Sequence, residues 1–427
     1  MEKEIVAGII FVLMYAVIVS EKMHRTVVAM LGALLMILLG IMNQETALHH
    51  VDFNTLGLLI GMMVIVAITS RTGLFHFIAV WAAKRAQANP VRLLVYLSLL
   101  TAVCSAFLDN VTTVLLMVPV TFSITEKLRV HVMPYLLAQI LASNIGGTAT
   151  LIGDPPNIMI GSAVKELTFA AFIENLALIA AINLAVVTFL FVLFYRRGLQ
   201  TKPELQRLVM EQDEHRELKD IPLLRKCLFV LGLVILCFFL HSWTGLESSL
   251  VALAGAFFLL LLVGKKDSIV EHALNGVEWT TIFFFIGLFI AVGGLVETGI
   301  IRDLAVKAVA ITGGDVTKTS LLVLWMSALV SAFLDNIPFV ATMIPLIQDM
   351  GQMGVAHLEP VWWSLALGAC LGGNGTIIGA SANVIVAGMA AERGIKLSFA
   401  SYFKVGFPLM LLTILISTIY VYLCYLL

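Results

Sequence analysis

Ser105-Ala-Phe-Leu-Asp-Asn110 recurs 226 positions later as Ser331-Ala-Phe-Leu-Asp-Asn336. The same offset, without gaps, aligns Gly146-Gly147 with Gly372-Gly373, Thr150 with Thr376, Gly153 with Gly379 and Asn157 with Asn383. A single register that spans this much of a chain is typical of an internal duplication. The repeated positions are polar or small, so the duplication preserves more than an apolar pattern.

The composition predicts that the repeats lie in a membrane. Hydrophobic residues make up 60% of the 427 positions, charged residues only 12%, and the mean hydropathy is +1.02. Soluble domains carry about 25% charged residues, so a soluble fold is excluded. The formal net charge of −1 provides no basic field that would attract nucleic acid. We therefore expect an all-α integral membrane protein.

The apolar runs predict about ten transmembrane helices, at about 20 residues each. Each repeat then contains an odd number of crossings, so the second repeat is inverted relative to the first, as in many secondary transporters. Each repeat also contains a re-entrant helical hairpin and an unwound helix. The expected units are residues 1–196 (hairpin 92–127, unwound helix 134–164), a linker 197–226, and residues 227–427 (hairpin 318–348, unwound helix 361–391).

Basic residues predict the orientation. Most of the 26 lysines and arginines fall on one side of this topology, including Arg25, Lys265, Lys266 and those of the polar linker 197–226. Positive residues favour the cytoplasm. We expect a multi-pass protein of the cell membrane, with a cytoplasmic linker and both termini outside.

The hairpins contain the first chemical motif. Asp109 and Asp335 each stand midway along an apolar hairpin, where an ionised carboxylate is costly and marks a functional site by default. Aspartate, asparagine and threonine compete for backbone hydrogen bonds, and Pro338 cannot continue a helix. The alternative is that Asp109 only caps the second hairpin arm; capping and ion binding can coexist.

The unwound helices contain the second motif, in residues 144–157 and 372–383. Their glycines and prolines cannot form regular helix, and such backbone is tolerated at membrane depth only where it is packed in protein or lines a cavity. Exposed carbonyl groups bind cations there, and half-helix N-termini bind anions or neutral oxygens. The alternative is close helix packing through small residues, which leaves the interleaved Asn, Thr and Asp unexplained.

The hairpin tips and unwound segments are predicted to converge on one pocket at the membrane midplane. Its acids are Asp109 and Asp335, with Asp154 in only one repeat. Burial favours the protonated form of a carboxylate, so Asp109 and Asp335 could exchange a proton for a cation. No intramembrane lysine or arginine is evident, so we expect no fixed salt bridge at these acids.

The strings FLDNVTT, NIGGTATLIGDPPN, FLDNIP and GGNGTIIGASANV resemble the ion transporter superfamily, in the branch of ArsB arsenite permeases, NhaD sodium/proton antiporters and the pink-eyed dilution protein. The resemblance implies an inverted-repeat fold with a pocket at the hairpin tips, and a homodimer. The matching site positions are Asp109, Asn110, Thr112, Thr113, Asn144, Gly147, Thr148, Thr150, Asp154, Asn157, Asp335, Asn336, Asn374, Thr376, Ser381 and Asn383.

The expected function is ion-coupled secondary transport. Proton-coupled export of arsenite or antimonite is the main hypothesis. As(OH)₃ is uncharged at neutral pH, so hydroxyl, amide and backbone groups suffice to bind it. A sodium/proton antiporter and an anion transporter or channel of the pink-eyed dilution type are the alternatives. The dicarboxylate carriers of this superfamily have Ser-Asn-Thr at their hairpin tips, and the Asp-Asn found here disfavours a citrate or succinate substrate.

The expected partners are membrane lipid and a small inorganic solute or ion, without nucleic acid. No cofactor is expected beyond a coupling H⁺ or Na⁺, and no metal site, because the five cysteines form no CxxC pair. The chain has no nucleotide-binding P-loop, which leaves a separate ATPase subunit open. No enzyme activity is expected, since an aspartyl protease would need a different setting for its acids. Cys104 and Cys370 either meet a soft As(III) or Sb(III) ion or serve as packing residues.

Overall fold

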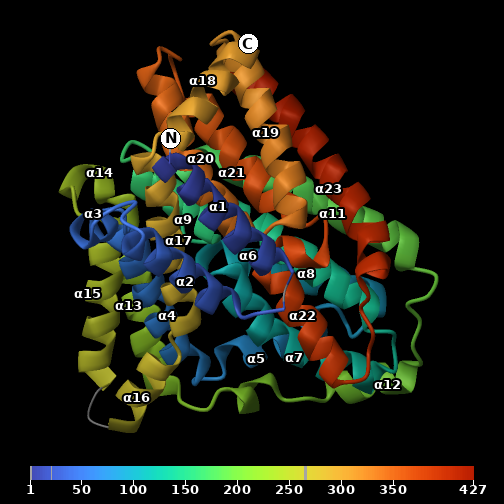
Figure 1. The fold of residues 1–427 in the computed structure, drawn as a ribbon. Coiled ribbons are helices and arrows are strands. Elements are labelled where there is room, and N and C mark those ends of the chain that lie inside the picture. The colour runs from blue at the N-terminus through green and yellow to red at the C-terminus, as the bar shows by residue number, and fades with distance from the viewer. Residues whose placement is uncertain (1, 21, 264–266) are drawn as a thin grey trace.

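The computed structural model describes residues 2–20, 22–263 and 267–427, and all regular secondary structure in these ranges is helical (Figure 1). Lys265 and Lys266, two of the bases assigned above to the cytoplasmic side, lie outside the described residues. By length and composition, eight described helices can cross a membrane: Phe53–Ser70, Pro90–Phe107, Asn110–Leu128, Phe169–Tyr195, Ile221–Phe239, Trp279–Glu297, Val316–Phe333 and Phe399–Leu426. The chain is a multi-pass membrane protein.

The helices of the two halves follow one another in the same order. The central pairs are α4 (Phe53–Ser70) with α17 (Trp279–Glu297), α5 (Leu74–Arg85) with α18 (Ile300–Thr312), α6 (Pro90–Phe107) with α19 (Val316–Phe333), α7 (Asn110–Leu128) with α20 (Asn336–Gln352), α8 (Met133–Thr148) with α21 (Glu359–Gly372) and α9 (Pro155–Ala163) with α22 (Ser381–Glu392). The first residues of α4, α5, α6, α7, α8 and α9 each lie 226 positions before those of their partners.

The flanking helices pair in the same way. They are α1 (Glu2–Val19) with α13 (Ile221–Phe239), α2 (Arg25–Leu38) with α15 (Ser248–Val263), α3 (Gln44–His49) with α16 (Asp267–Asn275), and α11 (Leu178–Tyr195) with α23 (Phe399–Val421). The remaining elements are short: α10 (Phe169–Phe172), η1 (Ile173–Ala177), α12 (Pro203–Met210), η2 (Glu214–Glu217), α14 (His241–Thr244), η3 (Ile377–Gly379) and η4 (Tyr422–Leu426).

Each half contains two interruptions of helix where the sequence motifs predict them. Leu108 and Asp109 separate α6 from α7, and Leu334 and Asp335 separate α19 from α20. Residues 149–154 separate α8 from α9, and residues 373–380 separate α21 from α22, with only the short η3 between them. The arms α6, α7 and α19 are themselves long enough to span a membrane. Their re-entrant character and the inversion of the repeats therefore stay predictions.

The two halves pack against each other reciprocally: α4 lies on α15, and α17 lies on α2. A Cβ on Gly61 of α4 would lie 2.6 Å from the backbone of Ala252, and a Cβ on Gly287 of α17 would lie 2.6 Å from the backbone of Ala29. Gly61 and Gly287 are equivalent positions, and so are Ala29 and Ala252, at an offset of 223. These two close approaches have the symmetry expected of a duplicated chain.

The linker between the halves is shorter than the predicted 197–226. Residues 221–226 belong to α13, because Asp220 caps that helix by accepting a hydrogen bond from the Leu223 N–H at 2.9 Å. The linker also packs on the protein. The backbone N–H of Lys219 donates to the Thr72 carbonyl oxygen at 2.9 Å, and Lys84 of α5 forms an ion pair with Glu214. The hydrogen bond from Lys84 lowers the pKa of Glu214 below its ordinary value.

The reciprocal glycine contacts predict a stability effect. Gly287→Val places three carbon atoms against the α2 backbone, and such overpacking costs about 1–3 kcal/mol. We expect a lower melting temperature in detergent and the same direction of change for Gly61→Val. The matched control is Gly388→Ala on α22, where an added Cβ meets no atom within 4 Å. Equal melting temperatures for all three variants would contradict the close packing.

The Lys84–Glu214 contact predicts a pH-dependent attachment of the linker. Because the folded state lowers the pKa of Glu214, the stabilisation is present above the ordinary glutamate pKa of about 4.3 and is lost as the pH falls through the lower folded value. We expect lower protection against hydrogen exchange in α12 and η2 for Lys84→Met at pH 7, and for the wild type in acid once the intrinsic exchange rate at each pH is taken into account. Lys127→Met, at another exposed base, should leave the exchange unchanged.

Candidate functional site

Both hairpin tips are closed by their aspartates. Asp109 caps α7, where its Oδ1 accepts a hydrogen bond from the Thr112 N–H at 2.8 Å and its Oδ2 accepts one from the Thr112 hydroxyl. Asp335 caps α20, where its Oδ1 accepts from the Ile337 N–H at 3.1 Å. The capping interpretation is confirmed. The caps also hold each carboxylate at the positive end of a helix dipole.

The unwound segments are braced by one asparagine each. The Asn157 side-chain amide donates to the Thr150 carbonyl oxygen at 2.9 Å, and it also faces the carbonyls of residues 147 and 148. The equivalent Asn383 donates to the carbonyls of Gly373 at 2.7 Å and Thr376 at 2.9 Å. Both asparagines are fully buried. They satisfy backbone carbonyls at the helix interruptions, which a buried break requires.

Equivalent hydroxyl groups join each unwound segment to its hairpin. The Thr150 hydroxyl donates to the Ala106 carbonyl oxygen, and the Thr376 hydroxyl donates to the Ala332 carbonyl oxygen. Ala106 and Ala332 lie in the last turns of the first hairpin arms. The tip and the unwound segment of each half therefore form one unit.

Asn144 connects the two halves. Its side-chain amide donates to the side-chain oxygens of Asn374 and Asn383, both at 3.0 Å. Its own side-chain oxygen accepts a hydrogen bond from Asn110 at 3.1 Å. All four asparagines are buried. The structure thus brings both unwound segments and the first hairpin tip to one place, as the sequence predicts.

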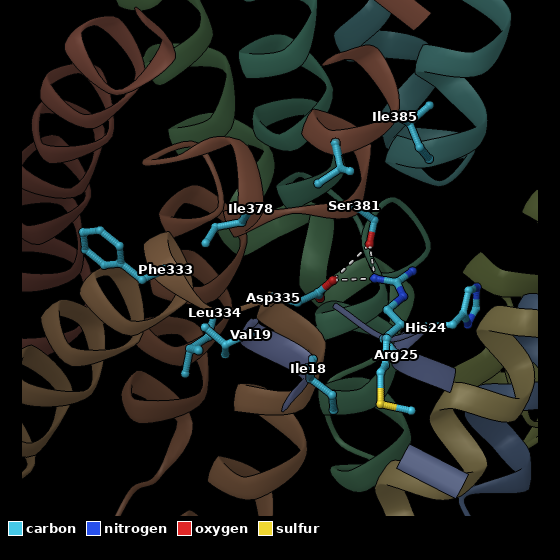
Figure 2. Close-up of a pocket in the computed structure, with 12 residues that line it drawn as sticks. Ile18, Val19, His24, Arg25, Phe333, Leu334, Asp335, Ile378, Ser381 and Ile385 are labelled. Carbon is cyan, nitrogen blue, oxygen red and sulfur yellow. Dashed lines mark hydrogen bonds and ion pairs between the residues drawn. The ribbon is translucent and has the colours of Figure 1, made fainter. Parts of the chain in front are cut away.

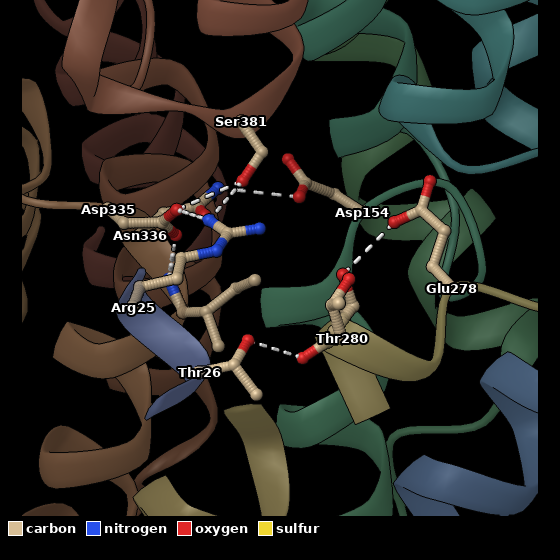
Figure 3. Close-up of polar contacts among 10 residues, drawn as sticks. Arg25, Thr26, Asp154, Glu278, Thr280, Asp335, Asn336 and Ser381 are labelled. Carbon is tan, nitrogen blue, oxygen red and sulfur yellow. Dashed lines mark hydrogen bonds and ion pairs between the residues drawn. The ribbon is translucent and has the colours of Figure 1, made fainter. Parts of the chain in front are cut away.

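A small acidic pocket lies beside this network. Asp109, Asp154 and Glu278 line a cavity of about 20 Å³, which is room for one water molecule. Asp154 is fully buried, and its Oδ1 accepts a hydrogen bond from the Asn336 amide at 3.4 Å (Figure 3). Its Oδ2 has no hydrogen-bond partner. A buried carboxylate oxygen without a partner is the strongest sign of a missing ligand in this site.

Arg25 overturns the expectation that no arginine neutralises these acids. Its Nη1 donates to Asp335 Oδ2 and to the Ser381 hydroxyl, both at 2.7 Å (Figures 2 and 3). Arg25 begins α2, and the sequence placed it with the basic residues of a loop. The start of α2 therefore lies at the second hairpin tip, and the arginine belongs to the site.

Two site residues were therefore missed. Arg25 lies 310 positions from Asp335, and no local pattern signals that contact. Glu278 stands directly before a long apolar helix, and no sequence pattern links it to Asp109 or Asp154. Its side chain accepts a hydrogen bond from Thr281 at 3.0 Å. Three carboxylates and one arginine line the pocket: Asp109, Asp154 and Glu278 with Arg25, whose own ion-pair partner is Asp335 of the neighbouring cavity. This surplus suits a proton or a cation.

The remaining predicted residues line or support the same region. The Thr148 hydroxyl donates to the Asn144 carbonyl oxygen at 2.8 Å, and Gly147 lets the backbone of Gly153 approach. The buried Thr113 hydroxyl has no partner. Of the two cysteines considered, Cys370 reaches Asn157 with an Sγ to Oδ1 distance of 3.4 Å. Cys104 instead packs beside a small apolar cluster formed by Val66, Phe75 and Leu108.

A family model described as "CitMHS: Citrate transporter" matches residues 15–368, which include both hairpins and the first unwound segment. The chain belongs to the citrate transporter (CitMHS) family. An "uncharacterized transporter" of Mycobacterium tuberculosis is 41% identical to this CitMHS protein over 99% of the chain and 98% of that relative. The human P protein is 36% identical over 95% of the chain and 58% of its own length.

Among solved structures, the YdaH transporter of Alcanivorax borkumensis, described as having an unusual topology, has a TM-score of 0.58. That match covers 88% of this chain and 86% of the other at 16% identity, and it supports the fold alone. The family match and the P protein relatives confirm the resemblance to the ArsB, NhaD and pink-eyed dilution branch. This CitMHS protein is a membrane transporter.

The Asn144 network predicts how this CitMHS protein responds to its loss. Asn144→Ala leaves buried polar groups of three other asparagines without a partner, at about 1–3 kcal/mol for each such group. We expect a lower melting temperature and loss of transport. Ser364→Ala is the control, because that buried hydroxyl already lacks a partner and its removal should cost nothing. A stable, active Asn144→Ala protein would show that the network does not hold the halves together.

Proposed function

We propose that this protein is a proton-coupled secondary antiporter in which Asp154 carries the coupling proton. The observation that carries the proposal is the environment of this side chain. Asp154 is fully buried, one of its oxygens has no partner, and it lines the same small cavity as Asp109 and Glu278. An isolated ionised carboxylate in such a place is costly, and a bound proton or cation removes that cost.

The charges around the pocket favour this assignment over one centred on Asp335. Among the described residues, neither Asp109 nor Asp154 has a lysine or arginine partner, whereas Asp335 is paired with Arg25. Both oxygens of Asp109 already accept hydrogen bonds from Thr112. Asp154 is therefore the acid with free capacity. The cavity of about 20 Å³ has room for one water molecule beside the carboxylates.

Arsenite or antimonite is the exported solute that we propose. The site gathers buried amide and hydroxyl groups, which can bind the uncharged As(OH)₃ without a counter-charge. The Asn374 amide and the Thr113 hydroxyl have no partner in this conformation and are available as donors. The chain also resembles the ArsB permeases in the motifs that carry these groups.

Sodium is the second candidate, because the pocket has three carboxylates and a single arginine, which is already paired with Asp335. In the described ranges no three acidic, histidine or cysteine side chains lie close enough together to hold a metal ion, so a sodium ion would also need carbonyl oxygens. The same surplus of negative charge disfavours citrate, the substrate named in the family description, since it would repel a bare tricarboxylate.

Proteoliposomes with a pH-sensitive dye inside and an imposed proton gradient test the proposal. Arsenite, Na⁺ and citrate are added separately to the wild type, to Asp154→Asn and to the control Asp303→Asn, whose side chain is exposed on α18. We expect arsenite to drive a proton flux in the wild type and the control. Asp154→Asn should lower the flux at least tenfold, since its amide cannot exchange a proton.

Each other outcome has a definite meaning. A flux driven only by Na⁺ would keep Asp154 as the coupling residue and replace arsenite by sodium. An unchanged solute-driven proton flux in Asp154→Asn would show that Asp154 is not the coupling residue. Solute movement without any proton flux, in wild type and variant alike, would point to an uncoupled anion pathway of the pink-eyed dilution type.

A further inference from the structure

We infer that Arg25 is a tethered cation that fills the second repeat's ion site, so that only the first repeat's site, at Asp154 and Asp109, can exchange an ion. This inference deepens the proposed function and rests on it for the first site only. It assigns to Arg25 a role in setting how many ions the transporter binds. Removal of the arginine should create a second site for a monovalent cation.

The second site is occupied in the way an ion would occupy it. Arg25 Nη1 lies between Asp335 Oδ2 and the Ser381 hydroxyl, at 2.7 Å from each, and Ser381 also donates to Asp335 Oδ2 at 3.0 Å. The other carboxylate oxygen accepts the capping N–H of Ile337. Asp335 thus has no free oxygen while the guanidinium is in place; Figure 2 shows the contacts among Asp335, Arg25 and Ser381.

The arginine is held in position by contacts outside the hairpin. Its guanidinium carbon lies 5.1 Å from the centre of the Phe284 ring on α17, within reach of a cation–π interaction. The neighbouring Thr26 hydroxyl donates to the Thr280 carbonyl oxygen at 2.7 Å and ties the start of α2 to α17 (Figure 3). These contacts fix the charge beside Asp335.

At the first repeat's site, no lysine or arginine among the described residues forms such an ion pair with Asp109 or Asp154. Ser248 is the position that corresponds to Arg25 at the offset of 223, and its side chain is short and uncharged. Pro155 corresponds to Ser381 and has no hydroxyl group. The first repeat instead has Asp154 where the second has Ala380. One site therefore gained a built-in positive charge, and the other gained an extra carboxylate.

The filled site borders a larger cavity. Arg25, Asp335 and Ser381 line a cavity of about 300 Å³, and the Arg25 side chain is 32% exposed. Arg25 and Ser381 also line the small acidic pocket, so the guanidinium stands between the two cavities. A cation that reached this position after loss of the arginine would meet Asp335 Oδ2 and the Ser381 oxygen directly.

Equilibrium binding of ²²Na⁺ to the purified full-length protein at pH 8 tests the inference. We compare the wild type with Arg25→Gln, Arg25→Lys and the double variant Arg25→Gln/Asp335→Asn. Arg25→Gln should bind about one more Na⁺ per chain than the wild type. Arg25→Lys keeps a positive charge and should not, and the double variant should return to the wild-type value because its second carboxylate is gone.

Free guanidinium ion supplies the second measurement. At millimolar concentration it should displace the extra Na⁺ from Arg25→Gln and raise that variant's melting temperature, with no effect on the wild type. If Arg25→Gln folds poorly, purification with guanidinium present provides the folded protein.

Equal Na⁺ binding by folded Arg25→Gln and wild type would overturn the inference. So would extra binding that persists in the double variant, because it would not depend on Asp335. Binding is measured without transport, so the result stands even if no proton flux is found in proteoliposomes. A failure of the proposed function and a failure of this inference are therefore distinguishable.

Discussion

Backbone groups inside a membrane must find partners within the protein, and this constraint shapes the whole site. The breaks at residues 149–154 and 373–380 expose carbonyl groups far from water. Asn157 and Asn383 satisfy them in the same way in both halves, and Asn144 ties the two breaks together. The glycines at these breaks let neighbouring backbones approach closely. Binding groups can lie at membrane depth because these asparagines allow the helices to be interrupted there.

The charged residues around the two hairpin tips differ, although the helices of the two halves correspond. The two hairpin tips carry the same aspartate as a helix cap, yet Asp335 is paired with Arg25, whereas Asp109 has no basic partner among the described residues. Asp154 adds a further carboxylate to one side only. A duplicated chain begins with two equivalent sites, and unequal substitution gives them different tasks. In our proposals one site exchanges the coupling ion and the other holds a permanent charge.

The parts of the site that could be predicted are those with a local chemical reason. Asp109 and Asp335 cap helices because the residues around them disfavour continuous helix, and the glycine-rich and proline-rich segments break helices because of their own backbone preferences. The length of the linker was less predictable. The first turns of α13 contain charged residues and so look like linker in the sequence, although Asp220 caps the helix before them. Arg25 was assigned to a loop, because a count of basic residues does not show which distant residue a single side chain contacts.

The sequence by itself determined the membrane class, the duplication, the positions of the interruptions and the candidate polar residues, because hydropathy, repeat register and helix propensity are local properties. Only the tertiary structure decided which of those residues meet. The pairing of Arg25 with Asp335, the place of Glu278 beside Asp109 and the unpartnered oxygen of Asp154 all depend on contacts between segments that are far apart in the chain. Whether a charge is paired or unpaired depends on its neighbours in space, and the packing of the two halves decides which residues these are.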